Sequence, residues 1–158
     1  MDTQSRRDLF GKFALVSALS AFLSSCASSQ KTPSKRYIKN QAAQSRAYSQ
    51  AVITQGGTTI WLAGQTGPVD ESGKALDFEG QVRQTFSRMG QTLKEAGGQL
   101  SDIVTMTVFP TDIKNAQTFL RTRHEIFGDN FPASAMINIT ALAAPEMLIE
   151  IQAVAVVG

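Results

Sequence analysis

Amphipathic helices alternating with strands are the feature that most constrains how this chain can fold. From Ile103 to Phe109, and again from Met147 to Val156, apolar and polar residues alternate, as they do in half-buried strands. Elsewhere apolar residues recur every three or four positions, which is the spacing of one helical face. Such a chain buries its apolar surface by packing helices onto a sheet, so we expect an α+β domain.

Turn and capping residues mark two helices and an N-terminal hairpin. Strands are expected over 49–54 and 59–63, joined by the turn at Gly56-Gly57. A first helix should run from Asp77 to Gly97, because aspartate caps helix N-termini and glycine ends helices. A second should run from Asp112 to Gly128. Its apolar face is expected at Ile113, Ala116, Leu120 and Phe127.

The last two strands complete the order of elements. They are expected over 134–140 and 147–156, with Glu150 and Gln152 on the polar face of the final strand. The resulting order, β-β-α-β-α-β-β, predicts a single domain with two helices packed on one face of a mixed sheet. The opposite face still carries apolar residues, and self-association is the simplest way to cover it.

Composition excludes several classes of function. A chain of 158 residues with one cysteine has no internal disulfide and no cysteine-rich zinc site. The formal net charge of +2 gives no electrostatic reason to expect nucleic-acid binding. No Gly-Lys-Ser/Thr phosphate loop, serine nucleophile elbow or metal-spaced carboxylate set is present. We therefore expect no bound metal.

The N-terminal segment has the features of an export signal. Arg6-Arg7, followed by Leu9-Phe10, resembles a twin-arginine signal. The apolar stretch from Phe13 to Leu23 is too short to span a membrane, which takes about 20 residues. Leu23-Ser24-Ser25-Cys26 then resembles the site at which a lipoprotein is cleaved and lipidated. The alternative is an ordinary cleavable signal with a chance cysteine.

These features divide the chain into three parts. Residues 1–25 are expected to be a twin-arginine signal peptide, 26–45 the lipidated Cys26 and a polar tether, and 46–158 the folded domain. The protein is accordingly expected to be exported and anchored in the cell envelope through lipid on Cys26. The domain would then face the periplasm or the outside of the cytoplasmic membrane.

Short motifs along the domain resemble, in the same order, the landmarks of the Rid family of reactive intermediate deaminases, also called YjgF. These motifs are Tyr48-Ser49-Gln50-Ala51, Ala63-Gly64-Gln65, Phe131-Pro132-Ala133 and Ile149-Glu150-Ile151. The resemblance implies a chorismate-mutase-like fold and a homotrimer with ligand clefts between subunits. It also implies hydrolysis of 2-aminoacrylate and related imines or enamines to 2-keto acids and ammonia, without metal or cofactor.

The resemblance assigns roles to individual residues. Glu150 matches the carboxylate that places or activates water, Tyr48 a cleft tyrosine, and Gly64 a backbone contact to the substrate. Gln65 is also expected to bind substrate. The position at which the family carries a substrate-clamping arginine is Ser134 here. A serine cannot neutralise a carboxylate in a partly dry cleft, so ordinary 2-aminoacrylate deamination is expected to be weak or absent.

An arginine on the second helix offers a replacement clamp. By spacing, Arg121 or its neighbour Arg123 could supply a guanidinium beside Ser134; the alternative is that both are solvated surface residues. His124, on the same helix, is expected to be a partly buried structural histidine. Two functions stay open: a hydrolase for imines, enamines or activated carbonyls that lack the usual carboxylate, and a non-catalytic binding protein of the envelope.

Overall fold

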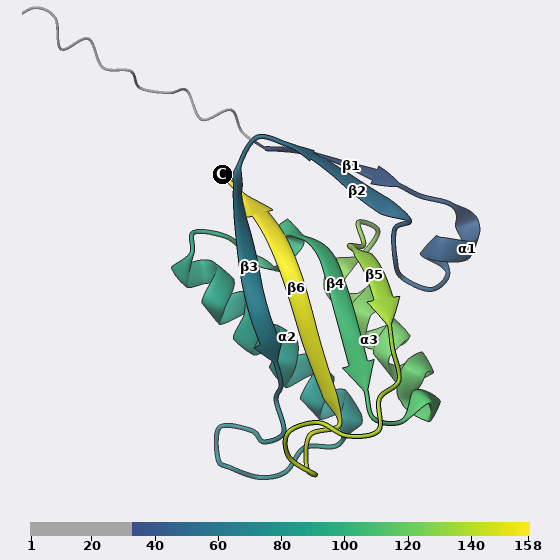
Figure 1. Cartoon of the computed structure of the whole chain (residues 1–158), viewed down its shortest axis with the longest axis vertical. Helices are drawn as coiled ribbons and strands as arrows, with labels where there is room; N and C mark the ends of the chain where they lie inside the picture. Colours follow the sequence, from purple (N-terminus) through teal and green to yellow (C-terminus); the bar gives the residue numbers. More distant parts are fainter. Residues whose placement is uncertain (1–32) are drawn as a thin grey trace, which may run out of the picture.

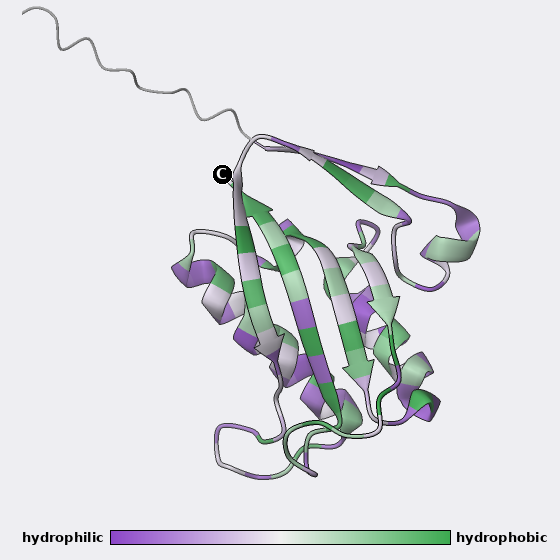
Figure 2. Cartoon of the chain, in the orientation of Figure 1, coloured by the Kyte–Doolittle hydropathy of each residue, from purple (hydrophilic) through white to green (hydrophobic). Residues whose placement is uncertain are grey.

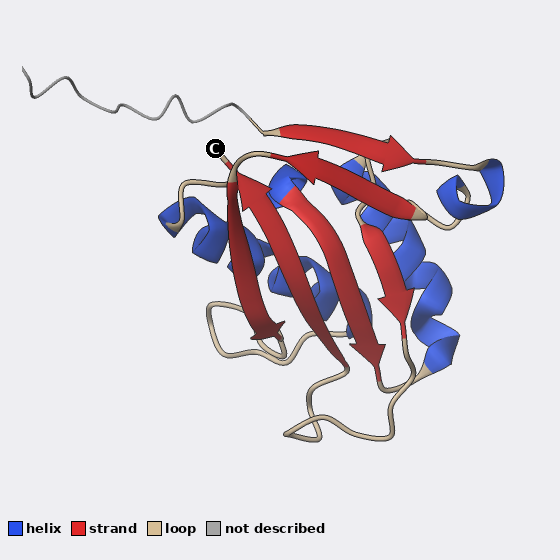
Figure 3. Ribbon diagram, turned by 45° about the horizontal axis from the view of Figure 1, so that its top comes forward, coloured by secondary structure: helices blue, strands red, loops and turns tan. Residues whose placement is uncertain are grey.

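The computed structural model describes residues 33–158, which are built around a four-stranded sheet with helices on one face (Figures 1 and 3). The strand order is β3-β6-β4-β5, with β4 and β5 parallel and the other pairs antiparallel. The expected α+β class and mixed sheet are confirmed. The strands are β3 (Thr58–Gln65), β4 (Ile103–Pro110), β5 (Ala133–Met136) and β6 (Ile149–Val157).

The first helix, α2 (Phe78–Glu95), begins and ends where the sequence predicts. The side chain of Asp77 accepts a hydrogen bond from the Gly80 backbone N–H at 2.8 Å, which satisfies one free donor of the first turn. Gly97 takes the left-handed conformation (φ 79°) that stops the helix, and the short 3₁₀ turn η1 (Leu100–Asp102) comes next.

The core lies between α2, the second helix α3 (Ala116–Phe127) and the sheet. Val82, Phe86, Met89 and Leu93, which recur every three or four positions along α2, are buried, and Phe86 contacts both Phe119 and Phe127 of α3. Figure 2 shows mostly apolar strands facing helices on which polar and apolar segments alternate. The core residues include Val82, Phe86, Met89, Leu93, Ile103, Met106, Val108, Phe119, Ile149, Ile151, Ala153 and Ala155.

The face that α3 buries differs from the prediction. Phe119, Thr122 and Arg123 are buried, whereas Ile113 is largely exposed. The expected face was counted as one continuous α-helix from Asp112. Residues Ile113–Asn115 instead form the 3₁₀ turn η2, capped by Asp112. Of the predicted residues, Leu120 and Phe127 pack against the edge of the core, whereas the packing of α3 on α2 buries Phe119 most deeply.

The N-terminal elements also correct the prediction. Strand β1 (Ser34–Ile38) pairs with β2 (Ala51–Gln55), and the short helix α1 (Gln41–Gln44) connects them. The expected hairpin of β2 with β3 is therefore wrong: after the turn at Gly56 and Gly57, β3 pairs with β6. The sequence analysis recognised only the following strand, β3, as a partner for β2. In the structure β2 pairs instead with β1, which lies in the segment predicted to be a tether.

The tether expected over 26–45 is therefore shorter than predicted, because the fold begins at about Ser34. Lys35 Nζ lies 2.6 Å from Asp102 Oδ1 and fastens β1 to η1. The signal segment and Cys26 lie in 1–32, outside the described residues. None of the helices within 33–158 is both long enough and apolar enough to cross a membrane.

Candidate small-molecule site

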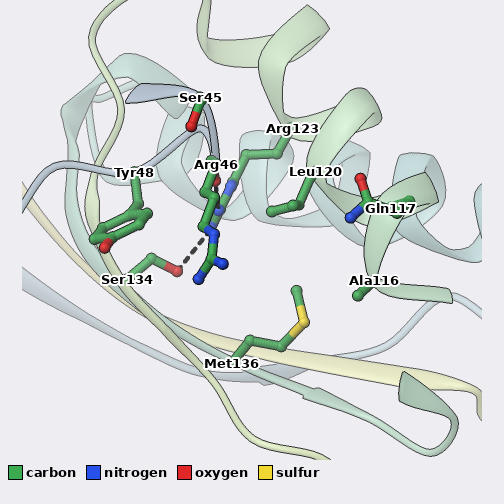
Figure 4. Close-up of a pocket in the computed structure, with 9 residues that line it drawn as sticks. All are labelled: Ser45, Arg46, Tyr48, Ala116, Gln117, Leu120, Arg123, Ser134 and Met136. Carbon is green, nitrogen blue, oxygen red and sulfur yellow. Dashed lines mark hydrogen bonds between the residues drawn. The ribbon is translucent and has the colours of Figure 1, made fainter. Parts of the chain in front are cut away.

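A pocket of about 480 Å³ opens between α3, β5 and the loop that joins α1 to β2 (Figure 4). Its volume is within the range of small-molecule sites. Two arginines line it and no acidic residue does. The lining residues are Ser45, Arg46, Tyr48, Ala116, Gln117, Leu120, Arg123, Ser134 and Met136.

A main-chain contact brings Tyr48 and Ser134 to the same pocket. The Ser49 N–H donates to the Pro132 carbonyl at 3.1 Å, and Ser49 forms a parallel bridge with Ala133. The α1–β2 loop is thereby fixed along the start of β5. Two motifs that lie far apart in the sequence are adjacent in the fold for this reason.

Arg123 projects from α3 into the interior and reaches Ser134. Its Nη1 donates to Ser134 Oγ and its Nη2 to the Arg46 carbonyl, both at 2.6 Å, while its guanidinium carbon lies 4.9 Å from the centre of the Phe119 ring. The residue is only 3% exposed. Burial lowers the pKa of Arg123 to about 10, so the side chain is still a cation at neutral pH.

One nitrogen of this side chain has no partner. Arg123 Nε is buried without a hydrogen-bond acceptor within residues 33–158. A buried donor without a partner costs about 1–3 kcal/mol.

Arg121 does not line the pocket. Its Nη2 lies 2.7 Å from Glu79 Oε2, and the side chain is 57% exposed. The burial of Arg123 had a signal in the sequence: Phe119 precedes it by four positions and Ile126 comes three positions after it, which places all three residues on one helical face. His124 is exposed rather than partly buried, with its ring against that of Phe131.

Glu150 and Gly64 form a second group on the other face of the sheet. The pairing of β3 with β6 is interrupted by a bulge between Leu62 and Gln65, and Gly64 lies in it. The carboxyl group of Glu150 lies over this glycine, because a Cβ placed on Gly64 would be 2.7 Å from Glu150 Cδ. Glu150 is half-buried, and Gln65 pairs with Ile151.

Register and burial separate the two groups. Ser134 and Met136 of β5 lie beside Met106 and Val108 of β4, whose side chains are buried under the helices. Glu150 alternates with the buried Ile149 and Ile151, so it faces the open side. A single chain thus brings Tyr48 to Ser134 and Gly64 to Glu150, but it does not bring these two pairs together.

The described residues contain no group of histidine, cysteine, aspartate or glutamate side chains that could hold a metal ion. The pocket offers hydroxyl, amide and guanidinium groups above an apolar wall, so its chemistry is that of binding a small polar molecule. Fold and pocket together define an α+β protein with a cationic pocket between a helix and an edge strand.

Comparison with known proteins identifies the family. Residues 38–157 match the family model described as endoribonuclease L-PSP. The 2-iminobutanoate/2-iminopropanoate deaminase of Homo sapiens is 35% identical over 113 residues, which cover 70% of this chain and 80% of that protein. A RutC family protein of Pyrococcus abyssi is 32% identical over 111 residues, covering 68% and 84%.

Solved structures agree with this match. A Rid-family protein of unknown function from Yersinia pestis superimposes with a TM-score of 0.68 at 26% identity, covering 78% of this chain and 98% of that one. A YjgF-family member from Mycobacterium tuberculosis gives 0.58 at 30% identity, covering 78% and 100%. The chain belongs to the Rid family, also called YjgF or L-PSP.

Proposed function

We propose that this protein hydrolyses a small imine, enamine or related activated compound to a carbonyl product. One copy would supply the pocket with Tyr48 and Ser134, and a neighbouring copy would supply Glu150. The observation that carries this proposal is the half-buried carboxyl group of Glu150, which lies over the main chain of Gly64 on the open face of the sheet. The deaminase name of the human relative supports the same reaction class.

The proposed reaction requires one side chain that accepts and returns a proton. Water adds to the carbon of a protonated imine while Glu150 accepts a proton from that water, so a C–O bond forms, the C=N π electrons move to nitrogen, and a neutral carbinolamine results. Glu150 then gives that proton to the nitrogen. The C–N bond breaks as the hydroxyl group loses its proton to water, and ammonia and the carbonyl product leave. An enamine enters the same route after protonation at carbon gives the imine. Glu150 ends the cycle in its starting ionisation state, and no oxidant or reductant is consumed.

The open face of the sheet supports the participation of a second copy. Trp61 is 79% exposed there, above a hollow that Leu62, Thr105 and Gln152 help to line. Tryptophan is enriched at protein interfaces, because its ring combines a large apolar surface with a polar N–H group. We propose that copies of the chain cover this face by assembling into a closed ring. The family suggests that this ring is a homotrimer.

Replacing Glu150 tests the proposed reaction. With 2-iminobutanoate generated in situ, the unlipidated protein (residues 27–158) should accelerate release of 2-oxobutanoate over a protein-free control. Glu150→Gln should lower that rate roughly 100-fold, since general acid–base groups contribute about 10²–10⁴-fold. Glu95→Gln, at an exposed carboxylate on α2, is the matched control. Full activity in Glu150→Gln would refute the assigned role.

The second candidate function is a non-catalytic small-molecule binding protein of the cell envelope. The observation that favours it is Ser134, which stands where the family resemblance implies a clamping arginine. In that case the native protein would leave the rate of imine hydrolysis unchanged and would still bind small molecules in the pocket.

We also propose that the protein is exported through its Arg6-Arg7 signal and held in the envelope by lipid on Cys26. The sequence motifs support this proposal, and β1 begins only eight residues after Cys26, which would hold the domain near the membrane surface. Metabolic labelling with radioactive palmitate should mark the full-length protein and should fail in Cys26→Ala. Equal labelling of both proteins would exclude the lipid anchor.

A further inference from the structure

We infer that the outer side of the two-stranded ribbon formed by β1 and β2 is a membrane-facing surface that binds anionic lipid headgroups. This ribbon surface consists of Arg36, Lys39 and Ile53. The inference rests on the proposed lipid anchor at Cys26, and it goes beyond the anchor because it names the side of the folded domain that meets the bilayer.

The first argument is the distribution of charge along the chain. Residues 26–69 contain five basic residues and no acidic one, whereas residues 70–158 contain seven basic and eleven acidic residues. The formal charge is therefore +5 in the first part and −4 in the second, so the small net charge conceals two opposite halves. Such an asymmetry is typical of chains that contact a membrane surface or a nucleic acid.

The second argument is that the ribbon turns its free cations outward. Lys35 points toward the domain and pairs with Asp102, so its neighbour Arg36 faces the other side of the ribbon. Both Arg36 and Lys39 are exposed, and neither forms an ion pair within residues 33–158. The ammonium group of Lys39 donates instead to a carbonyl and an amide oxygen of the loop between α3 and β5. The charge of both residues is thus available to an external anion.

The third argument is an apolar side chain beside these cations. Ile53 of β2 pairs with Arg36 of β1 and is 40% exposed. Residues that face each other across an antiparallel pair lie on the same side of the ribbon, so the isoleucine and the guanidinium are neighbours. A cation next to an exposed aliphatic group suits a bilayer interface, where the charge meets headgroups and the apolar group reaches the acyl boundary.

The place where the chain enters the domain selects a membrane as the partner. Residues 27–33 separate Cys26 from β1, and seven residues span at most about 25 Å. The ribbon lies across the end of the sheet at which the described chain begins (Figures 1 and 3). Gly57 and the C-terminal Gly158 lie at this same end, beside Pro33. A lipid on Cys26 would hold this end of the domain close to the bilayer.

The same arrangement gives the orientation of the candidate site. Strand β3 runs away from the ribbon end, so Gly64, near the end of β3, and Glu150, near the start of β6, lie at the opposite end of the sheet (Figure 1). With the ribbon on the membrane, Glu150 would face the aqueous side, where a water-soluble substrate has access.

The test is the binding of the unlipidated protein to lipid vesicles. Residues 27–158 contain every described helix and strand. We expect this protein to cosediment with vesicles made of equal parts phosphatidylglycerol and phosphatidylcholine, and to bind vesicles of phosphatidylcholine alone roughly 10-fold more weakly or less. Raising the salt concentration from about 0.05 M to about 0.5 M should release it from the anionic vesicles, because salt screens exposed charges.

Two double variants locate the binding surface. Arg36→Gln combined with Lys39→Gln should weaken binding to the anionic vesicles roughly 25-fold, because each cation near an anionic surface contributes roughly 5-fold in affinity. Lys74→Gln combined with Lys114→Gln is the matched control. It removes the same charge from exposed side chains at the opposite end of the sheet and should leave binding near the native value.

A fluorescent dye reports the orientation without changing any charge. Residues 27–158 lack Cys26, the only cysteine, so a single cysteine can be introduced and labelled. A polarity-sensitive dye at Gln55→Cys, two positions from Ile53 on β2, should shift its emission to the blue when anionic vesicles are added. The same dye at Thr140→Cys, in the loop between β5 and β6, should keep its emission.

Several results would overturn the inference. Equal binding to the two kinds of vesicle would do so, as would equal losses in the two double variants, or a blue shift at Thr140→Cys and none at Gln55→Cys. Tighter binding of a short single-stranded RNA than of anionic vesicles would assign the ribbon surface to nucleic acid instead.

The membrane surface and the lipid anchor are judged separately. If palmitate fails to label the full-length protein while the unlipidated protein binds anionic vesicles through the ribbon, the surface stands and the anchor fails. If palmitate labels Cys26 and the unlipidated protein does not bind anionic vesicles, the anchor stands and the surface fails.

Discussion

At the scale of single residues, the site depends on which of two neighbouring arginines points inward. Arg121 and Arg123 are two positions apart on α3 and thus about 200° apart around the helix axis. One pairs with Glu79 on the surface, and the other is buried against Phe119 and Ser134. The sequence placed two arginines on this helix, and the spacing of Arg123 from Phe119 and Ile126 was the signal that favours Arg123 as the buried one.

Gly64 is the residue whose replacement should affect Glu150 most directly. A methyl group at this position would enter the space that the Glu150 carboxyl group occupies, and that flexible side chain would have to turn away. We expect Gly64→Ala to lower imine turnover about 10-fold while changing the free energy of unfolding by less than about 1 kcal/mol. Turnover assays and denaturant unfolding measure the two quantities.

The neighbouring exposed residue provides the control for this prediction. Ala63→Ser adds one atom within the same bulge and should leave turnover near the native value. Native turnover in Gly64→Ala would show that the position of the Glu150 carboxyl group over this glycine is unimportant.

At the scale of elements, the two helices show where local signals suffice. Helix α2 begins after its predicted cap, Asp77, and ends just before the predicted stop, Gly97. The apolar residues spaced three or four positions apart along it are buried. Helix α3 agrees only in part, because Ile113 lies in the turn η2 and is exposed, and the deeply buried Phe119 was not on the predicted face. The packing of α3 against α2 decided which of its residues are buried.

Two glycines of the α2 region allow this local description to be tested. Gly90 lies inside the helix, and a Cβ there would make only ordinary contacts with Leu100. Gly90→Ala should therefore raise the free energy of unfolding by about 0.5–1 kcal/mol. Gly97 has φ 79°, so Gly97→Ala should lower the same quantity by about 1 kcal/mol. Chemical denaturation measures both, and destabilisation by Gly90→Ala would contradict the packing described.

At the scale of the whole molecule, the sheet separates the two groups of candidate site residues. The arginine pocket lies on the helix-covered side, and Glu150 with Gly64 lies on the open side beside Trp61. A side chain does not pass through a sheet, so the proposed reaction would need the open face of one copy to meet the pocket of another. Under this proposal, activity would depend on assembly.

Mixed assemblies test this arrangement. Glu150→Gln and Arg123→Gln should each have low turnover alone. An equal mixture, unfolded and reassembled together, should recover about a quarter of native turnover, because in the proposed assembly one cleft in four combines two intact contributions. The control is a mixture of Glu150→Gln with Gly64→Ala, which lie on the same side of the cleft and should show no such recovery. Failure of the first mixture to gain activity would place both residues in one subunit.

The sequence by itself determined the fold class, helix α2, the two faces of β6 and the family, because each rests on local periodicity, capping or short motifs. Only the tertiary structure decided the partner of β2, the incorporation of Ser34–Ile38, the choice of Arg123 over Arg121 and the separation of Ser134 from Glu150. These features depend on contacts between segments that are distant in the sequence. Local periodicity and capping do not specify which distant segments come into contact. Those contacts are decided only when the whole chain packs into one core.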